Sequence, residues 1–388
     1  MIIIIITNIL YFIVFSLFIG FFIVRSVPPL YRPDLNVPKP FISLLFISIF
    51  ILGTIPLVDT AFLIMSFEST SFTNALGSLF TEYSIGQSYL DFLLFYVITI
   101  ISLKWIKQDK LKWLILIPIF GMVFAYSWTT HPAALSIAGY VFYVLHFIAA
   151  MSWVGTLTII SFFTKGETKW ISFMKWFTPL GITAVILVFM SGIGMMLLIT
   201  PNYADSLLLN YGQLQLIKHL LFIPLVFYGF AHGFILKHKM DDEYSRIGIK
   251  PRKSFQIETV ILLFVFIVTG FMSSSEPPHD VAETLQRVEA SSLGMFFIGD
   301  GTFNLENFVS IDFNFLSFIL LIIAIGSLGC MTILIGNNSN KNWLVPITLL
   351  SFVFLMYFSI MFSANMDTIE STLYYNGPLP FNIIYLHN

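Results

Sequence analysis

Long apolar runs alternate with short polar segments along nearly the whole chain. A helix needs about 20 mostly apolar residues to cross the roughly 30 Å of hydrocarbon in a bilayer. Runs of about this length predict ten membrane-spanning helices. They lie at 2–24, 41–65, 87–103, 112–128, 134–163, 177–199, 211–236, 255–272, 312–336 and 342–362. We therefore expect an all-α fold, a polytopic transmembrane helix bundle of about ten spans.

Basic residues gather in alternate polar segments. Of the 19 Lys and Arg residues, 17 lie in the segments after the first, third, fifth, seventh and ninth runs. Lys218 lies inside a run, and Arg287 lies in a segment of the other set. Because basic loops remain on the cytoplasmic side, this pattern predicts that both termini lie outside. The first run lacks a basic start and a cleavage site, and we expect it to be a retained helix.

Composition supports the same class. The chain is 57% hydrophobic and 10% charged, with a mean hydropathy of +0.88, whereas soluble domains are about 25% charged. We expect a multi-pass protein of the lipid bilayer of the cell (cytoplasmic) membrane. No basic tract suits nucleic acid, so that partner is not expected. The single cysteine, Cys330, excludes an internal disulfide and a thiolate cluster, so a metal site would use His, Met, Asp or Glu.

A histidine lies deep inside the fifth run. His146 is about 18 Å from the outer end of that run, near the middle of the bilayer. An imidazole in hydrocarbon is by default a ligand, a proton relay or a partner of another polar group. Ala149, Ala150 and Trp153 share its helix face, and the two alanines permit close helix approach. We predict that His146 is the central functional residue and faces the interior between the fifth, sixth and seventh runs.

Four more ionisable groups fall in the outer half of the membrane. Lys218 and His219 lie roughly 10 to 12 Å from the outer face, and Asp59 and Asp91 roughly 6 to 9 Å. An unpaired ammonium at such depth costs at least about 2.5 kcal/mol. We therefore expect Lys218 to pair with Asp59 or Asp91.

Methionine and histidine together form a ligand set that suits Cu(I). Glu258, Thr269 and Met272 share a face of the eighth run. The candidate metal ligands are His131, His146, His219, His279, Met190, Met195, Met196 and Met272, and the supporting residues are Trp153, Lys218, Asp59, Asp91 and Glu258. Most methionines in apolar helices are packing residues, and loop histidines are usually surface residues. His232 and His238 are expected to face lipid or the membrane surface.

Four short pieces, in order and spacing, resemble the copper resistance D (CopD) family. They are Thr130-His131-Pro132-Ala133-Ala134, the segment from His146 to Gly155, Tyr211-Gly212 followed after five residues by Lys218, and Glu258 opening a helix that ends near Pro277-Pro278. Thr156 stands where the family usually has glycine, and no copper-binding domain of the CopC kind is attached. The resemblance implies a membrane protein that handles copper, usually by moving it inward.

The resemblance also divides the chain. Residues 1–127 are expected to form N-terminal transmembrane helices, 128–280 a CopD-like transmembrane core, 281–310 an outer surface segment with a helix or turn, and 311–388 C-terminal transmembrane helices and a tail. An extracellular copper-binding protein is a candidate partner.

Three functions fit these features. The first is copper transport without catalysis, in which Cu(I) is captured outside and passed to His146; no nucleotide-binding loop is present, so a gradient or trapping would drive it. The second is a haem b-binding redox enzyme resembling the HemJ-type protoporphyrinogen oxidases, with His146 and either His219 or His232 as axial ligands. The third is a factor that delivers copper to a respiratory oxidase.

Overall fold

The computed structural model describes residues 2–166, 169–236, 238, 251–299, 307–337 and 344–368. Within these residues, nine helices are long and apolar enough to cross a membrane. The remaining predicted span, 112–128, corresponds to a shorter apolar helical stretch, Leu111–Ser127. The prediction of an all-α polytopic bundle is confirmed.

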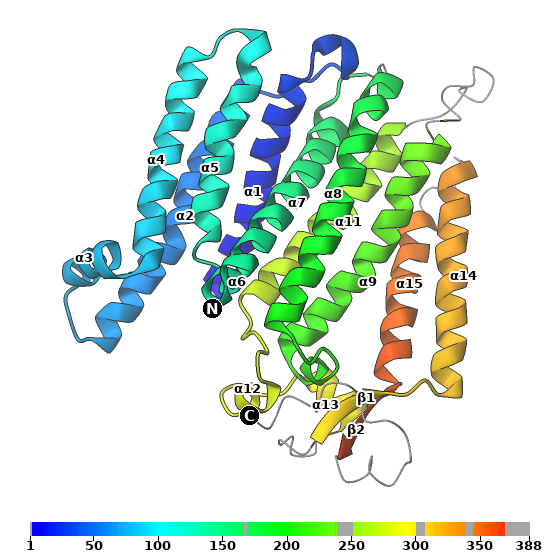
Figure 1. Ribbon diagram of the computed structural model, residues 1–388. Helices are drawn as coiled ribbons and strands as arrows, with labels where there is room; N and C mark the ends of the chain where they lie inside the picture. The colour runs from blue at the N-terminus through cyan, green and yellow to red at the C-terminus, as the bar shows by residue number, and fades with distance from the viewer. Residues whose placement is uncertain are drawn as a thin grey trace.

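The long helices lie side by side in one bundle (Figure 1). They are α1 (Ile2–Ser26), α2 (Lys39–Phe67), α4 (Ser84–Trp105), α5 (Leu116–Ser127), α7 (Ile137–Phe163), α8 (Trp170–Ile199), α9 (Asn210–Phe230), α11 (Pro251–Ser273), α14 (Phe315–Asn337) and α15 (Leu344–Met361). A 3₁₀ turn, η2 (Asp109–Ile115), precedes α5, and a π-helical turn, η4 (Ala231–Leu236), continues α9. Helices α2, α4 and α5 form one side of the bundle and α14 and α15 the other.

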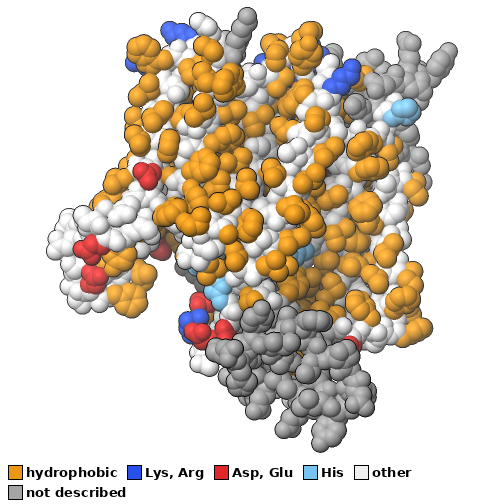
Figure 2. Space-filling view, in the orientation of Figure 1, with side chains coloured by type: hydrophobic (Ala, Val, Ile, Leu, Met, Phe, Trp, Pro, Cys, Tyr) orange, Lys and Arg blue, Asp and Glu red, His pale blue; other side chains and the backbone are white. Residues whose placement is uncertain are grey.

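The two ends of the bundle differ in charge. The α1–α2, α4–α5 and α7–α8 connections meet at one end, which we call the basic end, and most visible Lys and Arg side chains lie there (Figure 2). The opposite end, the cap end, holds the start of α1 and the short elements that follow. Apolar side chains cover the surface between the two ends. The first three basic segments thus share one end, while their placement on the cytoplasmic side stays a prediction. Lys341 and most basic residues of the segment between α9 and α11 lie outside the described residues.

Short elements cover the cap end. They are α3 (Phe72–Glu82), α6 (His131–Leu135), η3 (Asp205–Leu208), α12 (Val281–Leu285), α13 (Ser292–Ile298), β1 (Asn307–Ile311) and β2 (Ala364–Thr368); η1 (Pro29–Tyr31) lies at the basic end. Strand β1 pairs antiparallel with β2. The strands were not expected, because five residues give too short an alternation to stand out beside apolar runs. Asp205 Oδ1 accepts a hydrogen bond from Val309 N at 2.6 Å, which fixes β1 to η3.

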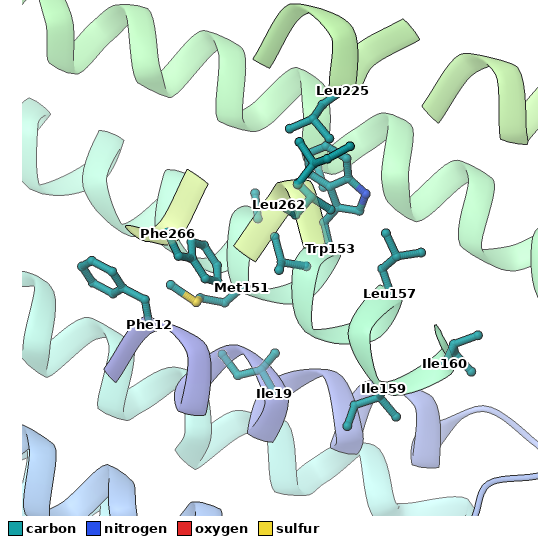
Figure 3. Packing of buried hydrophobic residues seen from close by; sticks show 14 of the residues in the cluster. Phe12, Ile19, Met151, Trp153, Leu157, Ile159, Ile160, Leu225, Leu262 and Phe266 are labelled. Atoms are coloured by element: carbon teal, nitrogen blue, oxygen red, sulfur yellow. The ribbon is translucent and has the colours of Figure 1, made fainter. Parts of the chain in front are cut away.

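The core is built around close contact between α1 and α7. Gly20 of α1 lies against the backbone of Gly155, and a side chain at Gly155 would run into the backbone of Ser16. Small residues spaced by four let helix backbones approach closely in lipid. Figure 3 shows buried side chains around this contact that come from α1, α7, α9 and α11. They include Phe12, Ile19, Met151, Trp153, Leu157, Leu225, Leu262 and Phe266.

The C-terminal helix pair is fixed to the rest of the bundle through α9. Tyr357 of α15 donates a hydrogen bond of 2.6 Å to Gln213 Oε1 of α9, and both side chains are buried. Gln213 Nε2 donates in turn to the Leu207 carbonyl at 2.5 Å. Because no water competes inside hydrocarbon, such polar contacts hold helices together. α14 and α15 therefore pack as part of the bundle in the described chain.

Replacing Gly155 by valine should disrupt the bundle. The added methyl groups meet the α1 backbone, which cannot move without separating the helices, and overpacking of this kind costs about 1–3 kcal/mol. We expect a lower midpoint of thermal unfolding and less folded protein in the membrane. Gly326→Val is the matched control, since nothing lies within 4 Å of a Cβ at Gly326. Equal unfolding midpoints for the two variants would contradict the proposed role of this contact.

Candidate functional site

His146 of α7 faces α8. Its Nδ1 lies 3.1 Å from the carbonyl oxygen of Val188 and 3.2 Å from Ser191 Oγ. The Ser191 hydroxyl donates to the Leu187 carbonyl, so both neighbours of Nδ1 act as acceptors and Nδ1 carries the proton. Nε2 then keeps its lone pair, and it has no hydrogen-bond partner among the described residues. This arrangement is typical of a metal-binding histidine, in which the bond to one ring nitrogen orients the other.

Space beside the ring is provided by a glycine. A Cβ at Gly192 would lie 3.5 Å from His146 Cε1, so the ring packs directly on the α8 backbone. The glycine that follows Ser191 is therefore part of the arrangement that fixes the imidazole. The Nδ1 edge of the ring faces α8, and the side chain as a whole is half-buried.

Helix α9 brings a second histidine and a lysine to the same region. Tyr203 OH lies 3.2 Å from His219 Nδ1, and the two rings stack with centroids 5.8 Å apart. Lys218 is close enough to interact electrostatically with both His146 and His219. We call His146, Ser191, Lys218 and His219 the His146 cluster. Within the described part of the chain, Lys218 has no hydrogen bond or ion pair.

The expected pairing of Lys218 with Asp59 or Asp91 is wrong. Both aspartates are exposed, and α2 and α4, which carry them, lie on the side of the bundle away from α9 (Figure 1). The sequence gives the depth of a residue in the membrane but not its position around the bundle. The three residues share a depth and lie on different sides.

The candidate methionines occupy different environments. Met190 is 60% exposed and faces outward, so it does not lie beside His146 as expected. Met195 follows Ser191 by four residues and therefore lies on the same face of α8, one turn nearer the cap end. Met196 and Met272 are partly buried near the cap end of their helices. Of the four thioethers, Met195 is the best placed relative to the His146 cluster.

Two candidate histidines, His131 and His279, lie at the cap end. Partial burial of its imidazole lowers the pKa of His131 below the ordinary 6.5, a positive charge on His279 lowers it further, and Glu276 acts in the opposite direction. These effects place the three side chains within electrostatic range of one another. Glu276 also pairs with Arg287, whose guanidinium lies 3.4 Å from the carboxylate.

Glu258 lies elsewhere, near the basic end. It is 1% exposed, and its Oε2 lies 2.7 Å from Nδ1 of His232, which is 3% exposed. His232 Nε2 lies 2.6 Å from Ser254 Oγ. The expectation that His232 faces lipid is wrong, because the π-helical turn η4 carries it inward, where Glu258 meets its polar ring. Trp153 is also buried here. Glu258, a carboxylate inside an apolar run, was the sequence feature that indicated a buried polar partner such as His232. His238 is exposed, as expected.

In the described part of the chain, no three side chains of the His, Cys, Asp and Glu types gather as a metal site. A soft site there would combine one or two imidazoles with a thioether, as His146, His219 and Met195 can provide. The candidate residues thus fall into a pair at the cap end, the His146 cluster, and a buried pair near the basic end.

Residues 171–272 match the family model described as Copper resistance protein D. The match confirms the resemblance to the copper resistance D family. It covers α8, α9 and α11 and contains Lys218, His219, His232 and Glu258, while His131 and His146 precede it. Comparison with curated proteins and with solved structures gave no match.

The pKa of His131 provides a test of the cap-end geometry. We expect a value below 6.5 by NMR of histidine-labelled protein in micelles, with the signal assigned by its loss in His131→Gln. His279→Gln should raise this pKa, because it removes a positive charge that opposes protonation, and Glu276→Gln should lower it, because it removes a favourable negative charge. If neither substitution shifts the pKa of His131, the three side chains are not neighbours.

Proposed function

Because this chain is, over residues 171–272, a copper resistance D family membrane protein, we propose that it transports copper across the cytoplasmic membrane and that His146 binds the ion on the way. The observation that carries the proposal is the hydrogen bonding of His146. Its Nδ1 is held by Val188 and Ser191 on α8, and the Nε2 of this half-buried ring has no hydrogen-bond partner among the described residues.

The ligand types favour Cu(I) over hard cations. Neutral imidazole and thioether are soft or intermediate ligands, whereas Mg²⁺ and Ca²⁺ prefer oxygen. His146 and His219 supply nitrogen, and Met195 supplies sulfur from one turn nearer the cap end. His131 and His279 at the cap end would capture the ion first, with Met196 and Met272 near their helix ends as further soft ligands. Met190 is left out of the path because its side chain faces outward.

Lys218 sets the charge of the path. An ammonium near both imidazoles repels a bound cation, and no carboxylate of the described residues pairs with it. We propose that this repulsion keeps binding weak, so that the ion is released toward the basic end. Inward transport, driven by a gradient or by trapping, agrees with the sequence-based orientation. An extracellular copper-binding protein is the proposed donor at the cap end.

The central test is His146→Ala. Loss of the only proposed ligand on α7 should reduce copper accumulation by cells at least tenfold, and should weaken Cu(I) binding to purified protein in competition with a chromophoric chelator. Met195→Leu should weaken binding to a smaller extent. Met190→Leu is the matched control, and it should behave as wild type because the side chain faces outward.

Unchanged copper accumulation in cells that contain folded His146→Ala protein would contradict the transport proposal. The visible absorption spectrum of the same preparations tests the haem reading. A Soret band in the wild type that is lost in His146→Ala would assign the histidine to haem instead.

Lys218→Met should strengthen Cu(I) binding. Removing the nearby positive charge removes repulsion, and we expect roughly tenfold tighter binding, or about 1.4 kcal/mol. Lys218→Arg retains the charge and should bind as the wild type does. Copper transport by Lys218→Met should be slower than transport by the wild type, because the more tightly bound ion is released more slowly. Weaker binding by Lys218→Met would instead indicate that the amine is itself a ligand.

A further inference from the structure

A cavity of about 210 Å³ lies between α7, α8, α11 and the end of α9. The side chains that line it are mostly apolar and aromatic, and they include Trp153, Phe177 and Phe255. Three glycines, Gly181, Gly229 and Gly233, also line the cavity and add no side chain to it. His232 follows His219 by 13 residues on the same helical stretch, or roughly 20 Å along the axis. The cavity is therefore distinct from the His146 cluster.

The cavity opens sideways between α8 and α9. Four of its lining residues are large and apolar and are exposed on the outside of the bundle: Ile182 (44%), Ile186 (55%), Phe230 (53%) and Phe234 (52%). Both helices are long enough to cross the membrane. A molecule dissolved in the bilayer can thus enter this cavity without passing through water.

Two buried polar side chains line this apolar cavity. Glu258 and His232 both line it and bond to each other at 2.7 Å. His232 Nε2 is engaged by Ser254. The second carboxylate oxygen, Glu258 Oε1, has no hydrogen-bond partner among the described residues. Because Glu258 lines the cavity, this oxygen can accept a hydrogen bond from a molecule that enters it.

We propose that this cavity binds the ring of a lipid-soluble quinol. A ring hydroxyl donates to Glu258 Oε1, the ring lies between the aromatic and glycine walls, and the isoprenoid tail remains in the bilayer. The volume is below the roughly 300–1,000 Å³ of sites for drug-sized ligands, so it fits a single ring rather than haem. A phosphate headgroup is disfavoured because it would meet a carboxylate.

Filling the cavity tests the proposal. Nothing lies within 4 Å of a Cβ at Gly181, so Gly181→Leu places its side chain in the open space without touching the buried pair. The matched control is Gly326→Leu on α14, where the space is equally open. Binding of the short-chain quinol decylubiquinol to protein in nanodiscs is followed by tryptophan fluorescence under anaerobic conditions, and Trp153→Phe identifies the signal from the cavity.

Saturable binding to the wild type and to Gly326→Leu is expected, with at least tenfold weaker binding to Gly181→Leu. Glu258→Gln should also bind more weakly, since an amide oxygen is a poorer acceptor than a carboxylate. Equal affinity of the wild type and Gly181→Leu would overturn the proposal. So would a phospholipid that copurifies with the wild type, resists displacement by decylubiquinol and is lost from Gly181→Leu. Copper binding by Gly181→Leu should be unchanged, so failure here is separable from failure of the copper proposal.

Discussion

The contact between α1 and α7 at Gly20 and Gly155 is the constraint on which the candidate sites depend. Lipid chains are as apolar as leucine side chains, so helices in a membrane gain little from hiding apolar surface and associate through packing and polar contacts. Two glycine backbones in contact fix the distance and rotation of α7. That rotation points His146 toward α8 and places Trp153 in the wall of the cavity near the basic end. One steric contact therefore orients residues at two different depths of the bundle.

Some polar groups inside the bundle have all their hydrogen-bond partners and others do not. We assign the first kind to stability and the second kind to the proposed functions. His232 bonds to both Glu258 and Ser254, and removing His232 would leave buried polar groups without partners, at a cost of about 1–3 kcal/mol each. Lys218 has no partner in the described chain, which a purely structural residue would not retain. The Nε2 of His146 and the Oε1 of Glu258 are similar, because each has no hydrogen-bond partner among the described residues.

Features that depend on a single helix were predictable from the sequence, and features that depend on neighbouring helices were not. The length of the apolar runs predicted the spans, whereas the functional importance of His146 stays a prediction. The pairing of Lys218 with Asp59 or Asp91 failed because helix order in sequence is not helix order in space. The prediction for His232 was wrong because the side chain lies on a π-helical turn, η4, which changes the direction of side chains. No pattern of residues in the sequence predicted this turn. The β1–β2 pair joins segments more than fifty residues apart, which local alternation cannot reveal.

The family match and the His146 cluster overlap only in part. Helices α8, α9 and α11 hold the matched residues, and they contribute Ser191, Lys218 and His219 to the cluster, whereas His146 comes from α7. The matched helices alone also leave the cavity near the basic end without Trp153 as a wall. Since α7 is held in place by α1, residues outside the match determine the geometry of both sites. Without the helices before the match, the matched segment would keep its polar residues but lose the surface that opposes them.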